Sequence, residues 1–177
     1  MVETAVFAAA LTRNVHRPDL LLFAALFHDI GKGTQEDHSE RGEKLIEPLA
    51  RRIGFDENDI ATLKLLVKHH LLLSATATRR DLDDPATIAS VTAVIPDLQT
   101  LELLHALSIA DGQATGRAAW SDWKESLLSE LVSRVTSALT DNTIARQPEF
   151  TNEQRELANS GELQVRIEAR DPDFAIE

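Results

Sequence analysis

The feature of this 177-residue chain that most constrains its fold is a short apolar run with two polar residues at its end. Leu20 to Phe27 carries no charged side chain, and His28 and Asp29 follow it directly. A helix that is apolar on nearly every side is buried inside a protein, whereas this run is far too short to span a membrane. We therefore expect a central helix from Leu20 to Ile30, ended by Gly31 in a left-handed conformation.

The composition favours an all-α fold and excludes several classes of function. Gly and Pro are sparse, with 7 and 6 residues, whereas Leu, Ala and Glu are abundant. The chain has no cysteine, which excludes disulfides and thiolate sites, and no signal-peptide pattern opens it. The formal charge of -11 disfavours long nucleic acid as a partner but is compatible with a single nucleotide bound through a metal. We expect a soluble, cytoplasmic protein without a membrane span.

Apolar periodicity and capping residues predict helices along the first 140 residues. Between them, Ser74 to Asp83 is expected to be irregular and Gly112 to Ala119 to be a loop. The predicted helices run from Val2 to Arg13, Leu20 to Ile30, Ser39 to Ile53, Asp56 to Leu71, Asp84 to Pro96, Asp97 to Asp111 and Ser121 to Leu139.

The composition changes after Thr140, which predicts a boundary there. Residues 1–140 then form one domain, and residues 141–177 form a linker and the truncated start of a C-terminal region. In that region Thr151-Asn152-Glu153-Gln154 is a capping-box pattern for a short helix. The alternation of apolar and polar residues from Leu163 to Glu168 predicts a strand.

The adjacent His28 and Asp29 suggest a metal site at the end of the apolar helix. Imidazole and carboxylate are good ligands for Mn, Fe, Zn or Mg in mixed nitrogen–oxygen sites. The C-terminal end of a helix also favours a cation. The alternative is a buried His–Asp pair without a metal. Of the other histidines, we interpret His16 and His105 as surface or packing residues rather than ligands.

Three further residues are candidate ligands because of their position. Asp111 ends the second very apolar helix and follows Leu107 by four residues, so it faces packed side chains, where a carboxylate requires a compensating charge. His70 lies on the apolar stripe of its helix, whereas His69 points away from that stripe. His38 begins a helix after a polar loop. The alternatives are a capping or salt-bridged Asp111 and a surface His38.

Two basic residues are candidate phosphate contacts. Lys32 lies one turn past the His–Asp pair and can reach a phosphoryl oxygen. Arg80 lies in the segment expected to be irregular, and its alternative interpretation is a solvated charge. Trp120 and Trp123 either stack on a nucleotide base or pack the start of a helix against the core.

Together, these residues resemble the HD superfamily of metal-dependent phosphohydrolases. Within it, the chain resembles the HD domains of bifunctional enzymes that add and remove nucleotidyl groups on the nitrogen-regulatory PII protein. A His-Asp pair alone is common, but the Arg-Arg-Asp-Leu and Trp-Ser-Asp-Trp-Lys stretches are specific. The resemblance covers roughly Pro18 to Leu139 and rests on His28-Asp29-Ile30-Gly31-Lys32, His38-Ser39-Glu40-Arg41-Gly42, Lys68-His69-His70-Leu71-Leu72, Arg79-Arg80-Asp81-Leu82-Asp83-Asp84-Pro85, Ala110-Asp111 with Ala114-Thr115-Gly116, and Trp120-Ser121-Asp122-Trp123-Lys124.

The resemblance implies an all-helical bundle that removes a nucleotidyl group from a tyrosine of PII. The group is uridylyl or, in actinobacterial relatives, adenylyl. It also implies regulatory ACT domains after the HD domain and a first ligand histidine just upstream of the segment matching Val2 to Ala5. No histidine precedes Val2 here, so we expect one corner of the site to be missing. The implied ligands of the divalent metal are His28, Asp29 and Asp111, with His38 and His70 at a second position.

We therefore predict an HD-type metal-dependent phosphodiesterase domain that acts on nucleotidylated PII as part of a bifunctional enzyme. In this scheme Asp29 holds the metal and accepts a proton from water, while Lys32 and Arg80 neutralise charge on the phosphoryl group. Two alternatives remain open. One is a phosphohydrolase of free nucleotides, and the other is a regulatory fragment that is catalytically impaired.

Overall fold

The computed structural model describes residues 2–33, 35–116 and 120–141, which are helical with no strand among them. This confirms the predicted all-α class. The linker, short helix and strand predicted beyond residue 141 lie outside the described residues. The helices are α1 (Val2–Leu11), the 3-10 helix η1 (Thr12–Asn14), α2 (Pro18–Phe27), α3 (His38–Ile53), α4 (Glu57–Lys68), α5 (Leu72–Arg79), α6 (Pro85–Thr92), α7 (Leu98–Thr115) and α8 (Asp122–Asp141).

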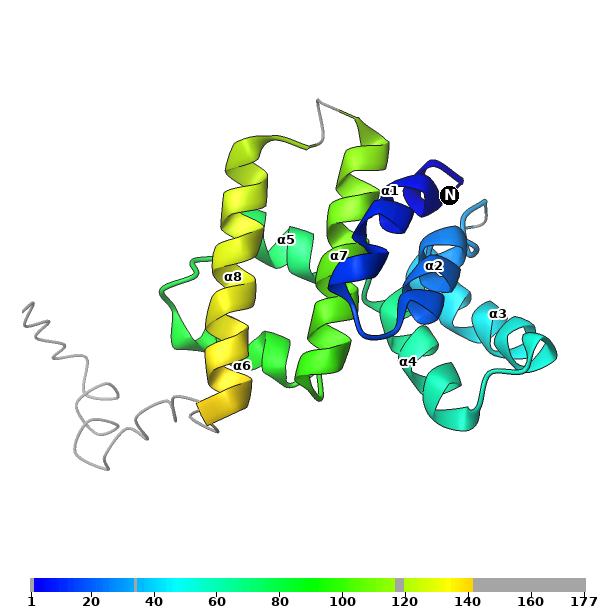
Figure 1. Ribbon diagram of the computed structural model, residues 1–177. Helices are drawn as coiled ribbons and strands as arrows, with labels where there is room; N and C mark the ends of the chain where they lie inside the picture. Colours follow the sequence, from blue (N-terminus) through cyan, green and yellow to red (C-terminus); the bar gives the residue numbers. More distant parts are fainter. Residues whose placement is uncertain (1, 34, 117–119, 142–177) are drawn as a thin grey trace, which may run out of the picture. The chain divides into compact units, whose positions relative to one another are not determined.

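Helix α7 forms the centre of the helical unit (Figure 1). The long α8 runs along one side of it, and α1 and α2 pack against another side. Helices α3 and α4 pack against each other, and α4 also contacts α2 and α7. The core between these helices is built mainly from leucine, including the fully buried Leu21, Leu63, Leu66, Leu104 and Leu107. None of the described helices has both the length and the hydrophobicity needed to cross a membrane.

Helix α2 is less buried and shorter than the sequence predicts. Leu22 and Leu26 are each 37% exposed, so one face of the apolar run is open to solvent in this structure. The helix ends at Phe27, and the segment from His28 to Gly31 forms turns instead of a further helical stretch. At the other end, the Arg17 guanidinium bonds the Asp59 carboxylate of α4, with the shorter Nη1–Oδ1 distance at 2.5 Å. The start of α2 is therefore held to α4.

Gly31 is required for close packing and not for a left-handed cap. It is not among the glycines with positive φ, which are Gly33, Gly54 and Gly116 in the described residues. A Cβ atom at Gly31 would lie 2.0 Å from the carbonyl oxygen of His38 and 2.8 Å from the backbone nitrogen of Gly42. The turn after α2 is thus pressed against the first turns of α3, and only glycine fits between them.

Two segments predicted to be irregular or looped are helical in their first part: α5 includes Ser74 to Arg79 and α7 includes Gly112 to Thr115, whereas Arg80 to Asp83 is irregular as predicted. Helix α5 is stabilised by burial of its apolar face: Leu73 and Ala77 belong to the core, and the helix packs against α8 and α7. Helix α7 continues past its predicted end at Asp111 to Thr115. Gly112 is tolerated inside α7 because the Trp120 ring packs on it, so a Cβ atom there would lie 2.2 Å from Trp120 Cε3.

Replacing Gly31 with alanine should destabilise the fold by about 3 kcal/mol, because the added methyl group overlaps the backbone of α3. Gly33→Ala is the matched control. Its site has open space but a φ of 100°, so the expected cost is only about 1 kcal/mol of backbone strain. Urea unfolding of both variants measures the difference. Equal losses would show that Gly31 is not sterically required.

Candidate metal centre

Four segments bring the predicted ligands to one place. The turn after α2 carries two of them, the start of α3 one, the turn after α4 one and the last part of α7 one. All five residues predicted from the sequence meet here. They are His28, Asp29, His38, His70 and Asp111.

The Asp29 carboxylate is at the middle of this group. Its Oδ1 lies 3.6 Å from His70 Nε2 and 3.9 Å from His38 Nε2. Its Oδ2 lies 3.3 Å from His28 Nε2 and 2.6 Å from Lys32 Nζ. The two oxygens of one side chain therefore face different sets of partners.

His28 joins Asp29 to Asp111. Its ring is fully buried, and its Nε2 lies 3.1 Å from Asp111 Oδ1. Burial lowers the pKa of His28, but the adjacent Asp111 and Asp29 carboxylates outweigh burial and raise this pKa to about 9. Burial raises the pKa values of both carboxyls, and the neighbouring His28 more than offsets this, so both are held below their usual range. Both carboxylates therefore remain ionised at neutral pH.

Backbone carbonyls orient the two buried imidazoles in the same way. His28 Nδ1 donates to the Ala25 carbonyl at 2.9 Å, and His70 Nδ1 donates to the Val67 carbonyl at 2.7 Å. Each bond leaves Nε2 facing the carboxylates, which is how proteins fix histidines as metal ligands. Burial lowers the pKa of His70, so its ring is neutral at neutral pH, the form that binds metals.

The residues present fit a divalent cation. The Nε2 atoms of His28 and His38 are buried and lack a hydrogen-bond partner with good geometry in the described part of the chain. Such orphaned atoms are uncommon in native structures and require an explanation. Ligand atoms of Asp29, His38 and His70 all lie within 4.8 Å of one another. This nitrogen–oxygen donor set suits Mn, Fe, Zn or Mg.

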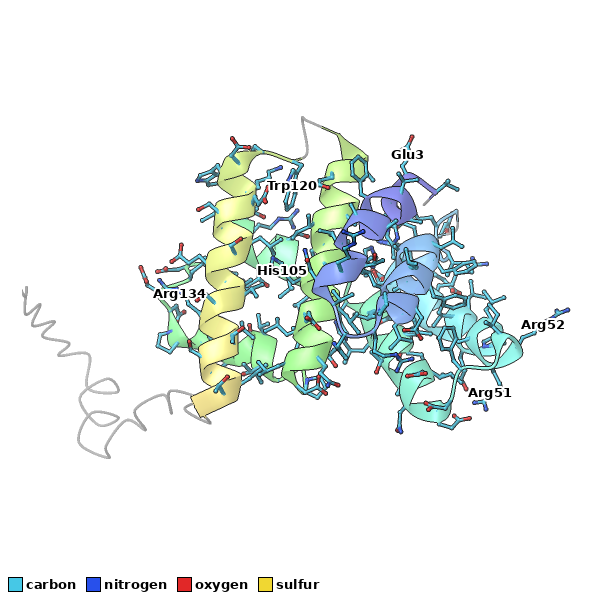
Figure 2. The ribbon with its side chains drawn as sticks, in the orientation of Figure 1. Glu3, Arg51, Arg52, His105, Trp120 and Arg134 are labelled. Carbon is cyan, nitrogen blue, oxygen red and sulfur yellow. The ribbon has the colours of Figure 1, made fainter. Side chains whose placement is uncertain are left out.

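The histidines that we did not predict to be ligands lie away from this cluster. The confirmed contrast is at the end of α4, where His70 is buried and His69 is partly exposed and turned elsewhere. His16 pairs with Glu102. His105 lies on α7 before Asp111, nearer the middle of the helix (Figure 2). Arg80, predicted as a phosphate contact, is exposed just after α5 and does not line the cavity at the cluster, as far as the described residues go.

The cluster opens into a cavity of about 310 Å³, and some of its walls were missed by sequence reasoning. Glu3 and Thr4 reach it from the first turn of α1, and no local sequence pattern marks them. Ala114 and Thr115 line it one turn after Asp111. Their spacing from Asp111 would have identified them if α7 had been predicted to continue.

Comparisons with known proteins agree with this geometry. The family model described as HD domain matches residues 1–112. The bifunctional uridylyltransferase/uridylyl-removing enzyme of Streptomyces coelicolor is 56% identical over 163 residues, which are 89% of this chain and 19% of that protein. The protein of the same name from Mycobacterium tuberculosis is 48% identical over 172 residues, 97% of this chain and 21% of that protein. The chain thus spans about a fifth of the length of these relatives.

Asp37 caps α3 next to the cluster, and its removal should destabilise the fold. Its carboxylate accepts hydrogen bonds from the backbone N–H groups of Ser39 and Glu40, at 2.9 and 3.1 Å. Asp37→Ala should therefore lower the thermal midpoint by a few degrees, whereas Asp37→Asn, which keeps an acceptor oxygen, should lose much less. Calorimetry compares the two, and an equal loss in both would mean that capping is not what Asp37 contributes.

Proposed function

The chain belongs to the HD-domain family, and from this premise we propose that it is a metal-dependent phosphodiesterase domain. Its proposed reaction is removal of a nucleotidyl group from the PII protein, as part of a longer bifunctional enzyme. The observation that carries the proposal is the convergence of three histidines and two aspartates around one cavity. The name of these relatives, which includes a uridylyl-removing activity, supports the choice of a nucleotidyl substrate.

Asp29, His38 and His70 are the donors that we propose for a divalent cation, with His28 and Asp111 completing the centre. When bound, such a cation supplies Lewis-acid activation of water and neutralises charge on the phosphodiester. Mn, Mg, Fe and Zn all fit the donor set, and metal analysis of the purified chain distinguishes them. We further propose a cytoplasmic location, where a PII substrate would be present.

The chain's own residues then act on the phosphodiester. Lys32 is 62% exposed at its side chain and lies beside Asp29, so its ammonium can move to a phosphoryl oxygen. Asp29 accepts a proton from the attacking water as the new P–O bond forms. The bond between phosphorus and the oxygen of the modified side chain breaks, and that oxygen takes up a proton. The products are a nucleoside monophosphate and a free hydroxyl group on PII.

Asp29→Ala should reduce metal-stimulated release of nucleotide from modified PII to background and remove most of the bound metal. The reason is that Asp29 is the carboxylate shared by both sets of partners. Asp83→Ala is the control, since Asp83 is 83% exposed at its side chain and pairs with Arg134 across the surface, away from the metal centre. Undiminished release by the Asp29 variant would refute the scheme.

The metal-loaded chain should release UMP or AMP from nucleotidylated PII and leave free nucleotides intact. The measurement is a comparison of uridylylated PII, adenylylated PII and a panel of nucleoside mono- and triphosphates at equal concentration. Faster hydrolysis of the free nucleotides would instead identify a nucleotide phosphohydrolase. A folded chain that takes up no added Mn, Fe or Zn would indicate a regulatory fragment without catalytic function.

A further inference from the structure

A second cavity next to the metal centre suggests how the substrate is held. We propose that the cavity between α5, α7 and α8 binds the nucleoside half of the nucleotidyl group, with Arg79 and Trp120 as its recognition residues. This inference rests on the proposed function, because it places the phosphate of the same group at the metal centre. It goes further in assigning a separate subsite to the base and ribose.

The two cavities adjoin each other. The second has a volume of about 300 Å³ and shares three lining residues with the cavity at the metal centre, which are Leu71, Asp111 and Thr115. Asp111 is itself one of the five clustered side chains, so the second cavity begins where the metal centre ends. Each cavity is of the size that holds a small molecule or a part of one. A nucleotide with its phosphate near Asp29 could therefore extend into the second cavity.

An aromatic ring forms one wall of this subsite. Trp120 packs on the backbone of Gly112, next to Asp111, and lies between the ends of α7 and α8 (Figure 2). It remains partly exposed and lines the cavity. The sequence left two roles open for Trp120, which were packing against the core and stacking on a nucleotide base. The structure shows the packing, and the exposed part of the ring is still available to a base. Trp123, in contrast, is 63% exposed and does not line the cavity, within the described residues.

Cationic and hydroxyl side chains also line this cavity. Arg79 lines it from the end of α5 and has no ion-pair partner among the residues that the structure describes. Lys124 lines it from α8. Ser74 and Thr78 line it as well, and their hydroxyl groups donate to the backbone carbonyls of Leu71 and Ser74, which leaves their oxygens able to accept hydrogen bonds. The Arg79 guanidinium is a cation in a chain with a net charge of -11, and it suits the carbonyl and hydroxyl oxygens of a nucleoside.

A nucleoside fits this subsite better than a polypeptide segment does. The cavity is bounded by three helices and Trp120, and it combines an aromatic wall with hydrogen-bonding groups. Base recognition typically uses this combination. On the other side of the metal centre, Glu3, Thr4 and Lys32 line the first cavity. That side is left for the modified segment of PII.

The test is binding of UMP, AMP and ribose 5-phosphate to the metal-loaded chain, measured by calorimetry. UMP or AMP should bind at least about 10-fold more tightly than ribose 5-phosphate, because only the nucleotides carry a base. In the Trp123→Phe chain, the remaining Trp120 fluorescence should change on addition of the nucleotide. Whichever nucleotide binds more tightly identifies the base that the subsite prefers.

Four substitutions locate the binding. Arg79→Ala should weaken nucleotide binding about 10-fold, and Thr78→Trp, at an exposed position on the cavity wall, should weaken nucleotide binding far more than ribose 5-phosphate binding. Arg52→Ala removes the same charge at the distant end of α3 and should change neither affinity (Figure 2). Arg80→Ala tests the neighbouring arginine favoured by the sequence and should weaken nucleotide binding less than Arg79→Ala.

The outcomes separate this inference from the proposed function. Equal binding of nucleotides and ribose 5-phosphate, or an Arg79 variant no weaker than the Arg80 variant, would overturn the subsite while leaving the metal chemistry intact. Base-dependent binding that requires Arg79, with no release of nucleotide from PII, would support the subsite and contradict the proposed function. If none of the three ligands binds, both are wrong.

Discussion

One carboxylate, that of Asp29, determines how the surrounding helices have to be arranged. It is only 15% exposed at its side chain, so its charge requires compensation from the protein. That compensation comes from His28 and Lys32, which both lie next to the carboxylate. His38 and His70 face the same carboxylate from the start of α3 and from the turn after α4, so a displacement of α3 or α4 relative to α2 would separate side chains that are proposed to bind one cation. The packing of the helices in the core therefore also sets the geometry and electrostatics of the centre.

Two glycines allow the helices around Asp29 to pack this closely. Gly31 lets the turn after α2 approach α3, and Gly42 lets α3 approach α4, where a Cβ atom would lie 2.8 Å from Val67 Cγ1. Val67 also provides the carbonyl that orients His70. The same close contacts that bury the core thus set the distance between Asp29 and its histidines. A larger residue at either glycine would separate side chains that have to act together.

The sequence predicted the fold class and the members of the cluster, because both depend on helical phase. His70 and Asp111 follow apolar residues at helical spacing, and the structure places them inward together with His28. Helix ends were predicted less well. Propensity did not reveal that Leu73 and Ala77 of α5 would be buried, or that Trp120 would cover Gly112 inside a continuing α7. The contribution of α1 through Glu3 and Thr4 depends on tertiary packing and has no local signature.

Asp111 and Gly112 are neighbours on α7, with one facing His28 and the other covered by Trp120. Consecutive residues of a helix point about 100° apart, and that angle cannot be adjusted without unwinding the helix. Any rotation of α7 would therefore alter the reactive centre and the aromatic wall at once. Evolution of a different base preference is accordingly more accessible through α5 and the start of α8, which can vary while the reaction geometry on α7 is preserved.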